Sequence, residues 1–160
     1  MNGWENFLGA QVGASAALLG LLFVSVSINL NKILSHPVLP GRAFGALLMM
    51  LVVLIISSLL LAPDQPMKLI GAEVLVIGLA AWATIVRIDF NTLKLAQAEY
   101  RLRATLLIAI NQIALILYVA CGVAILVAGK AGLYILVPAV ATSFIKVMLD
   151  AWVLLIEINR

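Results

Sequence analysis

Five long blocks of apolar residues constrain what this chain can fold into more than any other feature. The blocks cover roughly 7–30, 43–62, 69–87, 104–128 and 132–156. Each is close to the ~20 residues that an α-helix needs to cross ~30 Å of hydrocarbon. Charged residues make up only 11% of the chain, whereas soluble domains have about a quarter. We therefore expect one integral membrane domain over residues 1–160, an all-α polytopic bundle of five spanning helices.

The breaks between blocks contain residues that end helices. Three of them are "SHPVLPGR" at 35–42, "APDQP" at 62–66 and "AGKAG" at 128–132. Proline and glycine in such breaks stop one helix and let another begin. Because the breaks are short, consecutive helices should lie antiparallel.

The longest connection, 88–103, has a different composition. It holds Asn91 and Thr92, which are good helix caps, followed by charged residues among strong helix formers. We expect the fourth helix to begin in this connection, as a cytoplasmic extension over about 91–103. The extension is either a solvated helix end or a docking site for a partner.

Lysine and arginine are distributed unevenly between the two sides that five spans define. One side receives Lys32, Arg42, Arg87, Lys94, Arg101, Arg103 and Arg160. The other side receives only Lys68 and Lys130. Since positive loops stay in the cytoplasm, we expect the N-terminus outside and the C-terminus inside. Four spans behind an N-terminal amphipathic helix on the inner surface would fit the same charges.

The first block has two distinct faces when it is placed on a helix at about 100° per residue. One face is polar at both ends and apolar in the middle, with Gln11, Ser15, Leu18, Leu22, Ser25 and Asn29. The opposite face consists of small residues, Gly9, Gly13, Ala16, Gly20 and Ser27. Small residues let another helix approach closely, so we expect self-association through the second face.

The polar face of the first block admits two interpretations. Polar side chains in a membrane need a neighbouring helix or water. In a pore, Leu18 and Leu22 would form a hydrophobic constriction between polar rings. In a closed bundle, the same polar groups would hydrogen-bond to adjacent helices.

The fifth block contains two opposite charges, Lys146 and Asp150, on one helix face. A lone charge at this depth costs at least ~2.5 kcal/mol, so the two should pair inside the bundle. Thr142 extends the same face, and Asn111 of the fourth block is a plausible polar partner. The pair either fixes the rotation of the helix or forms an ion or proton site.

Other classes of site have little support in the sequence. Glu73 lies near the outer end of the third block, where an interfacial position is expected. One cysteine and one histidine do not make a metal cage. No motif of a nucleotide-binding, hydrolytic or nucleic-acid-binding protein is present. We expect no catalytic residues, cofactor, metal or nucleic-acid partner.

The first third of the chain also carries a recognisable pattern. It reads "NFLGAQVGASAALLGLLFVSVSINLNKIL", followed by "PVLPGRAFGALLMMLVVLI". An aromatic at Phe7, a Gly/Ala run, Gly20-Leu-Leu-Phe-Val, Ser27 to Leu30 and then Arg42 make up the pattern. It resembles a group of small, mostly uncharacterised bacterial multi-pass membrane proteins, some labelled modulators of an FtsH-type membrane protease. The resemblance implies a location in the bacterial inner membrane and carries over no catalytic residue.

Three functional hypotheses follow for a chain of this size. The first is a homo-oligomeric channel for ions or protons, lined by the polar face of the first helix. The second is a non-conducting regulatory or assembly partner of a larger membrane complex, such as a membrane protease. The third is a small ion- or proton-coupled carrier that uses Lys146 and Asp150.

Overall fold

The structure, a computed structural model, describes residues 3–95 and 101–156. These residues form helices and no strand, which confirms the all-α fold class. In chain order the helices are α1 (Glu5–Ile28), α2 (Leu30–Leu34), α3 (Leu39–Leu60), α4 (Met67–Leu95), α5 (Arg101–Ala128), the 3₁₀ helix η2 (Gly129–Ile135) and α6 (Leu136–Leu155).

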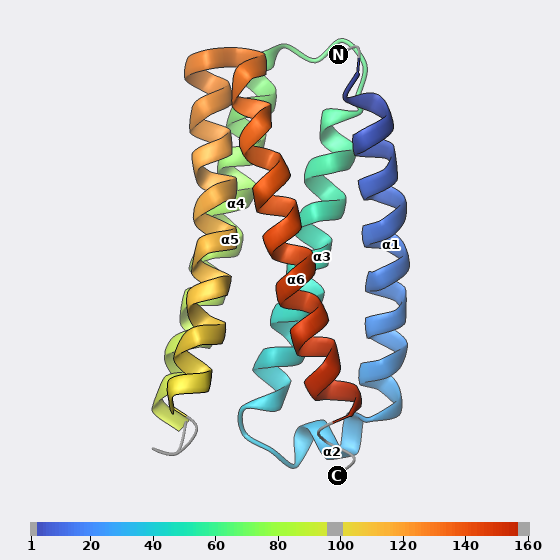
Figure 1. The fold of residues 1–160 in the computed structure, drawn as a ribbon, viewed down its shortest axis with the longest axis vertical. Coiled ribbons are helices and arrows are strands. Elements are labelled where there is room, and N and C mark those ends of the chain that lie inside the picture. Colours follow the sequence, from blue (N-terminus) through green and yellow to red (C-terminus); the bar gives the residue numbers. More distant parts are fainter. Residues whose placement is uncertain (1–2, 96–100, 157–160) are drawn as a thin grey trace.

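Five long helices run alternately up and down in a single bundle (Figure 1). One end, called here the N-terminal end, carries the start of α1, the α3–α4 loop and the η2 turn. The opposite C-terminal end carries α2 and the end of α6. The short α2 and the loop after it return the chain to the bundle at the start of α3.

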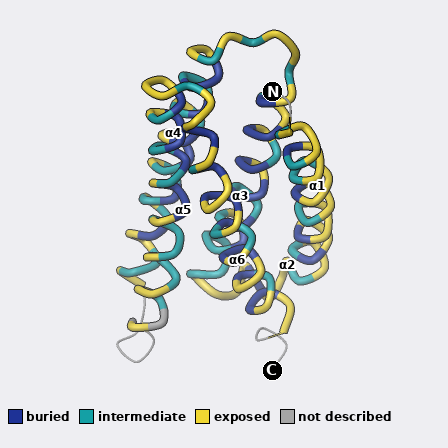
Figure 2. Tube along the Cα trace, turned by 45° about the horizontal axis from the view of Figure 1, so that its top comes forward, coloured by how far each residue is buried: buried dark blue, intermediate teal, exposed yellow. Residues whose placement is uncertain are grey.

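The described residues contain four continuous helical stretches that are long and apolar enough to cross a membrane. The last of these, Ala104–Leu155, has 52 residues and folds back on itself at η2, so that α5 and α6 are antiparallel (Figure 1). Large apolar side chains such as Phe23 and Val127 lie exposed on the outside of the bundle. Figure 2 shows this pattern along α1, whose outward side is exposed over its whole length. The chain is therefore a multi-pass membrane protein.

The first helix lies alongside the bundle rather than across its end (Figure 1). α1 packs mainly against α3, with a few contacts to α6. A helix on the membrane surface would instead lie roughly perpendicular to the spans. The arrangement differs from the alternative with an N-terminal surface helix and agrees with a spanning α1.

The sequence prediction for the 91–103 connection is wrong in its first part. Residues 91–95 continue α4, and the hydroxyl of Thr92 donates to the carbonyl of Ile88 at 3.0 Å within that helix. Asn91 and Thr92 therefore do not cap the next helix, because the backbone keeps the hydrogen bonds of α4. Helix α5 begins at Arg101, and residues 96–100 lie outside the described residues.

Glycines set the closest helix contacts. A Cβ on Gly122 of α5 would lie 2.6 Å from the backbone nitrogen of Leu75 on α4, so only glycine fits there. The η2 turn depends on Gly132, where a Cβ would lie 2.4 Å from the backbone of Ala124, and on Gly129, whose φ is +62°. These contacts fix α4, α5 and α6 relative to one another, and the polar site lies between these helices and α3.

Candidate functional site

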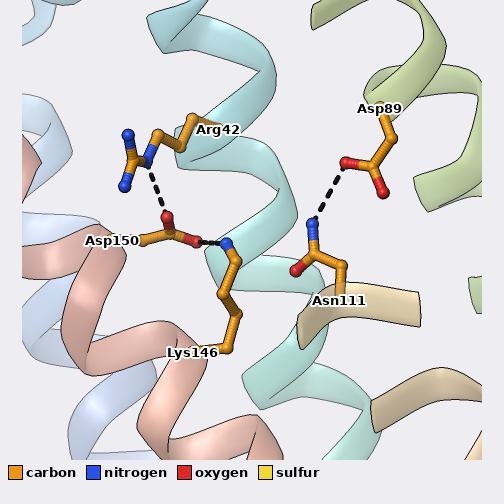
Figure 3. A network of polar contacts seen from close by, with 5 residues as sticks. All are labelled: Arg42, Asp89, Asn111, Lys146 and Asp150. Carbon is orange, nitrogen blue, oxygen red and sulfur yellow. Dashed lines mark hydrogen bonds and ion pairs between the residues drawn. The ribbon is translucent and has the colours of Figure 1, made fainter. Parts of the chain in front are cut away.

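A network of charged and polar side chains lies between the helices of the bundle (Figure 3). Lys146, midway along α6, donates to Asp150 one turn further on. The other carboxylate oxygen of Asp150 accepts from Nε of Arg42 on α3 at 2.6 Å. Lys146 is 4% exposed and Asp150 is 2% exposed, whereas the side chain of Arg42 is 19% exposed. One buried carboxylate therefore joins two cations from two helices.

A second carboxylate, Asp89 of α4, lies across the bundle and is 6% exposed. Its two oxygens accept from the side-chain amides of neighbouring α5 residues, Asn111 at 3.1 Å and Gln112 at 2.8 Å. Gln112 in turn accepts from the indole nitrogen of Trp82 at 2.7 Å. The carboxylate of Asp89 is thus held by neutral donors rather than by a direct cation.

The charged side chains of the network balance one another. Lys146 hydrogen-bonds directly to Asp150, and Asp89 is the second carboxylate buried in the same part of the bundle. Arg42, Lys146, Asp150 and Asp89 together have no formal net charge. Balanced charge is what allows such groups to remain buried among apolar helices.

Local helix geometry explains why these residues meet. Gly71 and Gly78 lie on the face of α4 that packs against α5. The sequence spacing from these glycines to Asp89 corresponds to nearly whole turns of a helix, so Asp89 lies on the same face. Arg42 lies in the first turn of α3, directly after the Pro40–Gly41 sequence that starts the helix. The Arg42 side chain therefore reaches from the C-terminal end of the bundle to the buried Asp150.

One further polar contact lies on the same face of α6. Ser143, one turn before Lys146, is fully buried and forms a 3.0 Å hydrogen bond with the hydroxyl of Tyr118 on α5. Ser143 also donates to the carbonyl of Ala139. These contacts extend the polar surface of α6 from Asp150 towards the centre of the bundle.

The predicted polar partners of the Lys146–Asp150 pair are placed differently from the expectation. Asn111 is bonded to Asp89 rather than to the pair, because α5 turns this residue towards α4. Thr142 is half-buried, and its hydroxyl donates to the carbonyl of Pro138 at 2.6 Å. Its hydrogen bond is therefore made within α6 rather than to the Lys146–Asp150 pair. Glu73 is half-buried near the N-terminal end of α4, far along the helix from Asp89.

The predicted pore face of α1 faces the inside of the bundle in the single chain. Ser15, Leu22 and Ser25 are buried, and Gln11, Leu18 and Asn29 are half-buried. The hydroxyl of Ser15 donates to the carbonyl of Gln11 at 2.6 Å, and the amide of Asn29 donates to the carbonyl of Ser25 at 3.1 Å. Within the chain this face therefore packs against α3, and a pore wall formed by it between protomers stays a prediction.

The opposite face of α1 is open. Gly9, Gly13, Ala16, Gly20 and Ser27 are all exposed. A Cβ added at any of the three glycines would meet no atom within 4 Å. No other helix of the chain therefore packs closely against these glycines, and the predicted packing role of this face stays a prediction.

No protein-family model, curated protein or solved structure matches this chain. The chemistry of the site therefore rests on its own residues.

Sequence reasoning missed Arg42, Asp89, Gln112 and Trp82 as members of the network. The sequence predicts Arg42 in a loop and Asp89 in a connection, because both stand at the edges of apolar blocks. One signal was present: Asp89 is an acidic residue in a region otherwise rich in Lys and Arg. Its partners, however, depend on how α4 and α5 pack together.

Proposed function

We propose that the protein is a small membrane carrier that moves protons across the bilayer and whose charge network forms the proton site. The observation that carries this proposal is the burial of Lys146, Asp150 and Asp89, which are 2–6% exposed within membrane-spanning helices. Ionisable groups at such positions are expensive and usually mark ion or proton paths. Contact of these helices with lipid does not explain why they carry a charge network inside the bundle.

The composition of the network favours a proton over a metal cation. Each oxygen of Asp150 already accepts from a cationic side chain, and Lys146 and Arg42 would repel a further cation. A proton needs no ligand shell, since it binds to a carboxylate oxygen or leaves an ammonium group. Addition of one proton to Asp150 would weaken both of its ion pairs at once.

Each residue has a role in this proposal. Asp150 receives the proton, and Arg42 links it to the C-terminal end of the bundle. Lys146 balances the charge of the carboxylates, and its ion pair with Asp150 weakens when Asp150 is protonated. Asp89, held by Asn111 and Gln112, is the second acceptor.

The orientation of the bundle in the membrane follows from the distribution of charge. Lys32, Arg42, Arg87 and Lys94 belong to helix segments at the C-terminal end, whereas Lys68 and Lys130 belong to segments at the other end. The positive-inside rule then assigns the C-terminal end to the cytoplasm and the N-terminus to the outside of a bacterial inner membrane.

Proton flux into proteoliposomes tests this function. Purified protein is reconstituted with a trapped pH-sensitive dye, and a potassium diffusion potential drives protons inward. We expect flux from the wild-type protein and none from Asp150→Asn. The matched control is Asp64→Asn, because Asp64 is exposed in the α3–α4 loop and its positive φ of 57° suits asparagine. Equal flux from Asp150→Asn and Asp64→Asn would reject the proposal.

A second candidate function is supported by the open glycine face of α1. A non-conducting partner of a larger membrane complex, or a homo-oligomer, would use Gly13 and Gly20 for close helix contact. Gly13→Leu should leave the fold of the protomer unchanged and disrupt self-association, which chemical crosslinking in lipid vesicles measures. Unchanged crosslinking would exclude this face as the contact between copies. Folded wild-type protein without any proton flux would favour the partner function over the carrier.

A further inference from the structure

Helices α1 and α3 pack together along a contact called here the α1–α3 seam, and both helices bury oxygen atoms that lack a hydrogen-bond partner. Among the residues that the structure describes, these are Oε1 of Gln11, Oγ of Ser25 and Oγ of Ser57. Ser57 is 0% exposed. Buried polar atoms in folded proteins are nearly always bonded to protein or to ordered water. Three such atoms along one helix contact therefore need an explanation.

The other hydroxyl groups of the spans show what is missing at Ser25 and Ser57. A hydroxyl within a helix ordinarily donates to the carbonyl four residues earlier. This bond is present at Ser15, Ser27, Thr84, Thr92, Thr142 and Ser143. Ser25 and Ser57 do not form it. Their hydroxyl groups are therefore free to bond to something in the seam.

The positions of Gln11 and Ser57 place them at the same level of the seam. Ala16–Phe23 of α1 and Phe44–Leu54 of α3 line one apolar groove on the outside of the bundle. Since the two helices are antiparallel, Gln11 and Ser57 both lie just beyond the end of that groove nearest the N-terminus. Gln11 lies on the buried face of α1, between Leu8 and Ser15.

Ser25 lies at the opposite end of the seam. By the same antiparallel alignment it stands level with Ala43, next to Arg42 in the sequence of α3. The unpartnered atoms thus occupy both ends of the α1 face that carries Leu18 and Leu22 between them.

The chemistry of these atoms fits water. The amide oxygen of Gln11 needs a donor, and the hydroxyl of Ser57 both donates and accepts. Water can donate to the first and accept from the second, so bound water satisfies both groups. A metal cation would need more oxygen ligands and a negative charge, and neither residue supplies a carboxylate.

We propose that the α1–α3 seam binds water, with one site at Gln11 and Ser57 and another at Ser25. This inference goes beyond the proposed function and does not depend on it. Leu18 and Leu22 separate the two hydrated sites and so restrict continuous passage of water.

Water-edited solid-state NMR of the full chain in lipid bilayers tests the inference directly. Magnetisation from water should reach the side-chain amide of Gln11 several-fold faster than that of Gln112. Gln112 is the matched control, because its amide groups are bonded to Asp89 and Trp82. Equally slow transfer to the two glutamines would overturn the water site.

Variants at Ser57 sharpen the same experiment. Ser57→Val fills the site without a hydrogen bond, so the fast transfer to Gln11 should be lost while the Gln112 signal stays in place. The smaller change Ser57→Ala should reduce the transfer even if valine prevents folding. Unchanged transfer in Ser57→Ala and in any folded Ser57→Val would also overturn the proposal.

Proton flux separates this inference from the proposed function. Fast water transfer to Gln11 without flux in the wild-type protein would retain the water site and reject the carrier. Flux without water transfer would retain the carrier and reject the hydrated seam.

Discussion

The charge network and the α1–α3 seam both bury polar atoms in an apolar bundle, yet they satisfy them differently. In the network, each carboxylate oxygen of Asp89 and Asp150 accepts a hydrogen bond from another side chain. In the seam, Gln11, Ser25 and Ser57 retain unpartnered oxygens. A buried charge is too costly to leave without a direct partner, whereas a neutral polar group needs only water. Substitutions in the network should therefore destabilise the fold more than substitutions in the seam.

The largest effect should come from removing the shared carboxylate. Asp150→Leu leaves Lys146 buried without its partner and also frees Arg42. Breaking a buried ion pair from one side costs about 3–5 kcal/mol. Unfolding in a denaturing detergent titration should shift by this amount relative to Asp64→Asn, and stability equal to that control would contradict a tightly coupled network.

Removing the second charge should reverse most of that loss. Lys146→Met in the Asp150→Leu background replaces the pair by apolar groups of similar volume, which is often neutral for stability. Arg42 is partly exposed near the end of the bundle, so its long side chain can extend to the membrane surface. The same titration should show the double variant to be more stable than Asp150→Leu alone. A double variant that is even less stable would mean that Lys146 has another essential partner.

A smaller effect should distinguish two glutamines. Gln112→Leu removes a donor from Asp89 and an acceptor from Trp82, which should cost about 1–3 kcal/mol because buried groups lose partners. Gln11→Leu removes no hydrogen bond within the protein through its side-chain oxygen, so its cost should be clearly smaller. Equal losses of stability in the two variants would contradict the difference in hydrogen bonding between the network and the seam.

The smallest effect should appear at two fully buried serines. Ser143→Ala breaks the bond to Tyr118 and should cost about 1 kcal/mol. Ser57→Ala removes a hydroxyl that has no hydrogen bond within the protein, so its cost should be smaller than that of Ser143→Ala. Thermal unfolding in one detergent compares the pair, and a larger loss at Ser57 would indicate a protein partner there.

The sequence predicts those parts of the fold and site that depend on local periodicity. The apolar blocks predict the spanning helices, and the i,i+4 spacing of Lys146 and Asp150 predicts that they share a helix face. The same reasoning separates the two faces of α1, of which the polar one is buried and the small one exposed.

Contacts between helices were not predictable in the same way. Asn111 was expected beside Lys146, but the rotation of α5 against the glycines of α4 turns it to Asp89. Arg42 joins Asp150 only because the first turn of α3 packs beside the last turns of α6. Such pairings depend on the packing and rotation of whole helices, which no single segment encodes.

Proton flux through the Lys146→Met/Asp150→Leu double variant tests the central claim most directly. The measurement compares wild-type and double-variant proteoliposomes that contain equal amounts of folded protein, under the same potassium diffusion potential. Loss of flux in a folded double variant is the predicted result, because the proton site is gone while its apolar replacement preserves the bundle. Wild-type flux from the folded double variant would contradict a proton site at Lys146 and Asp150.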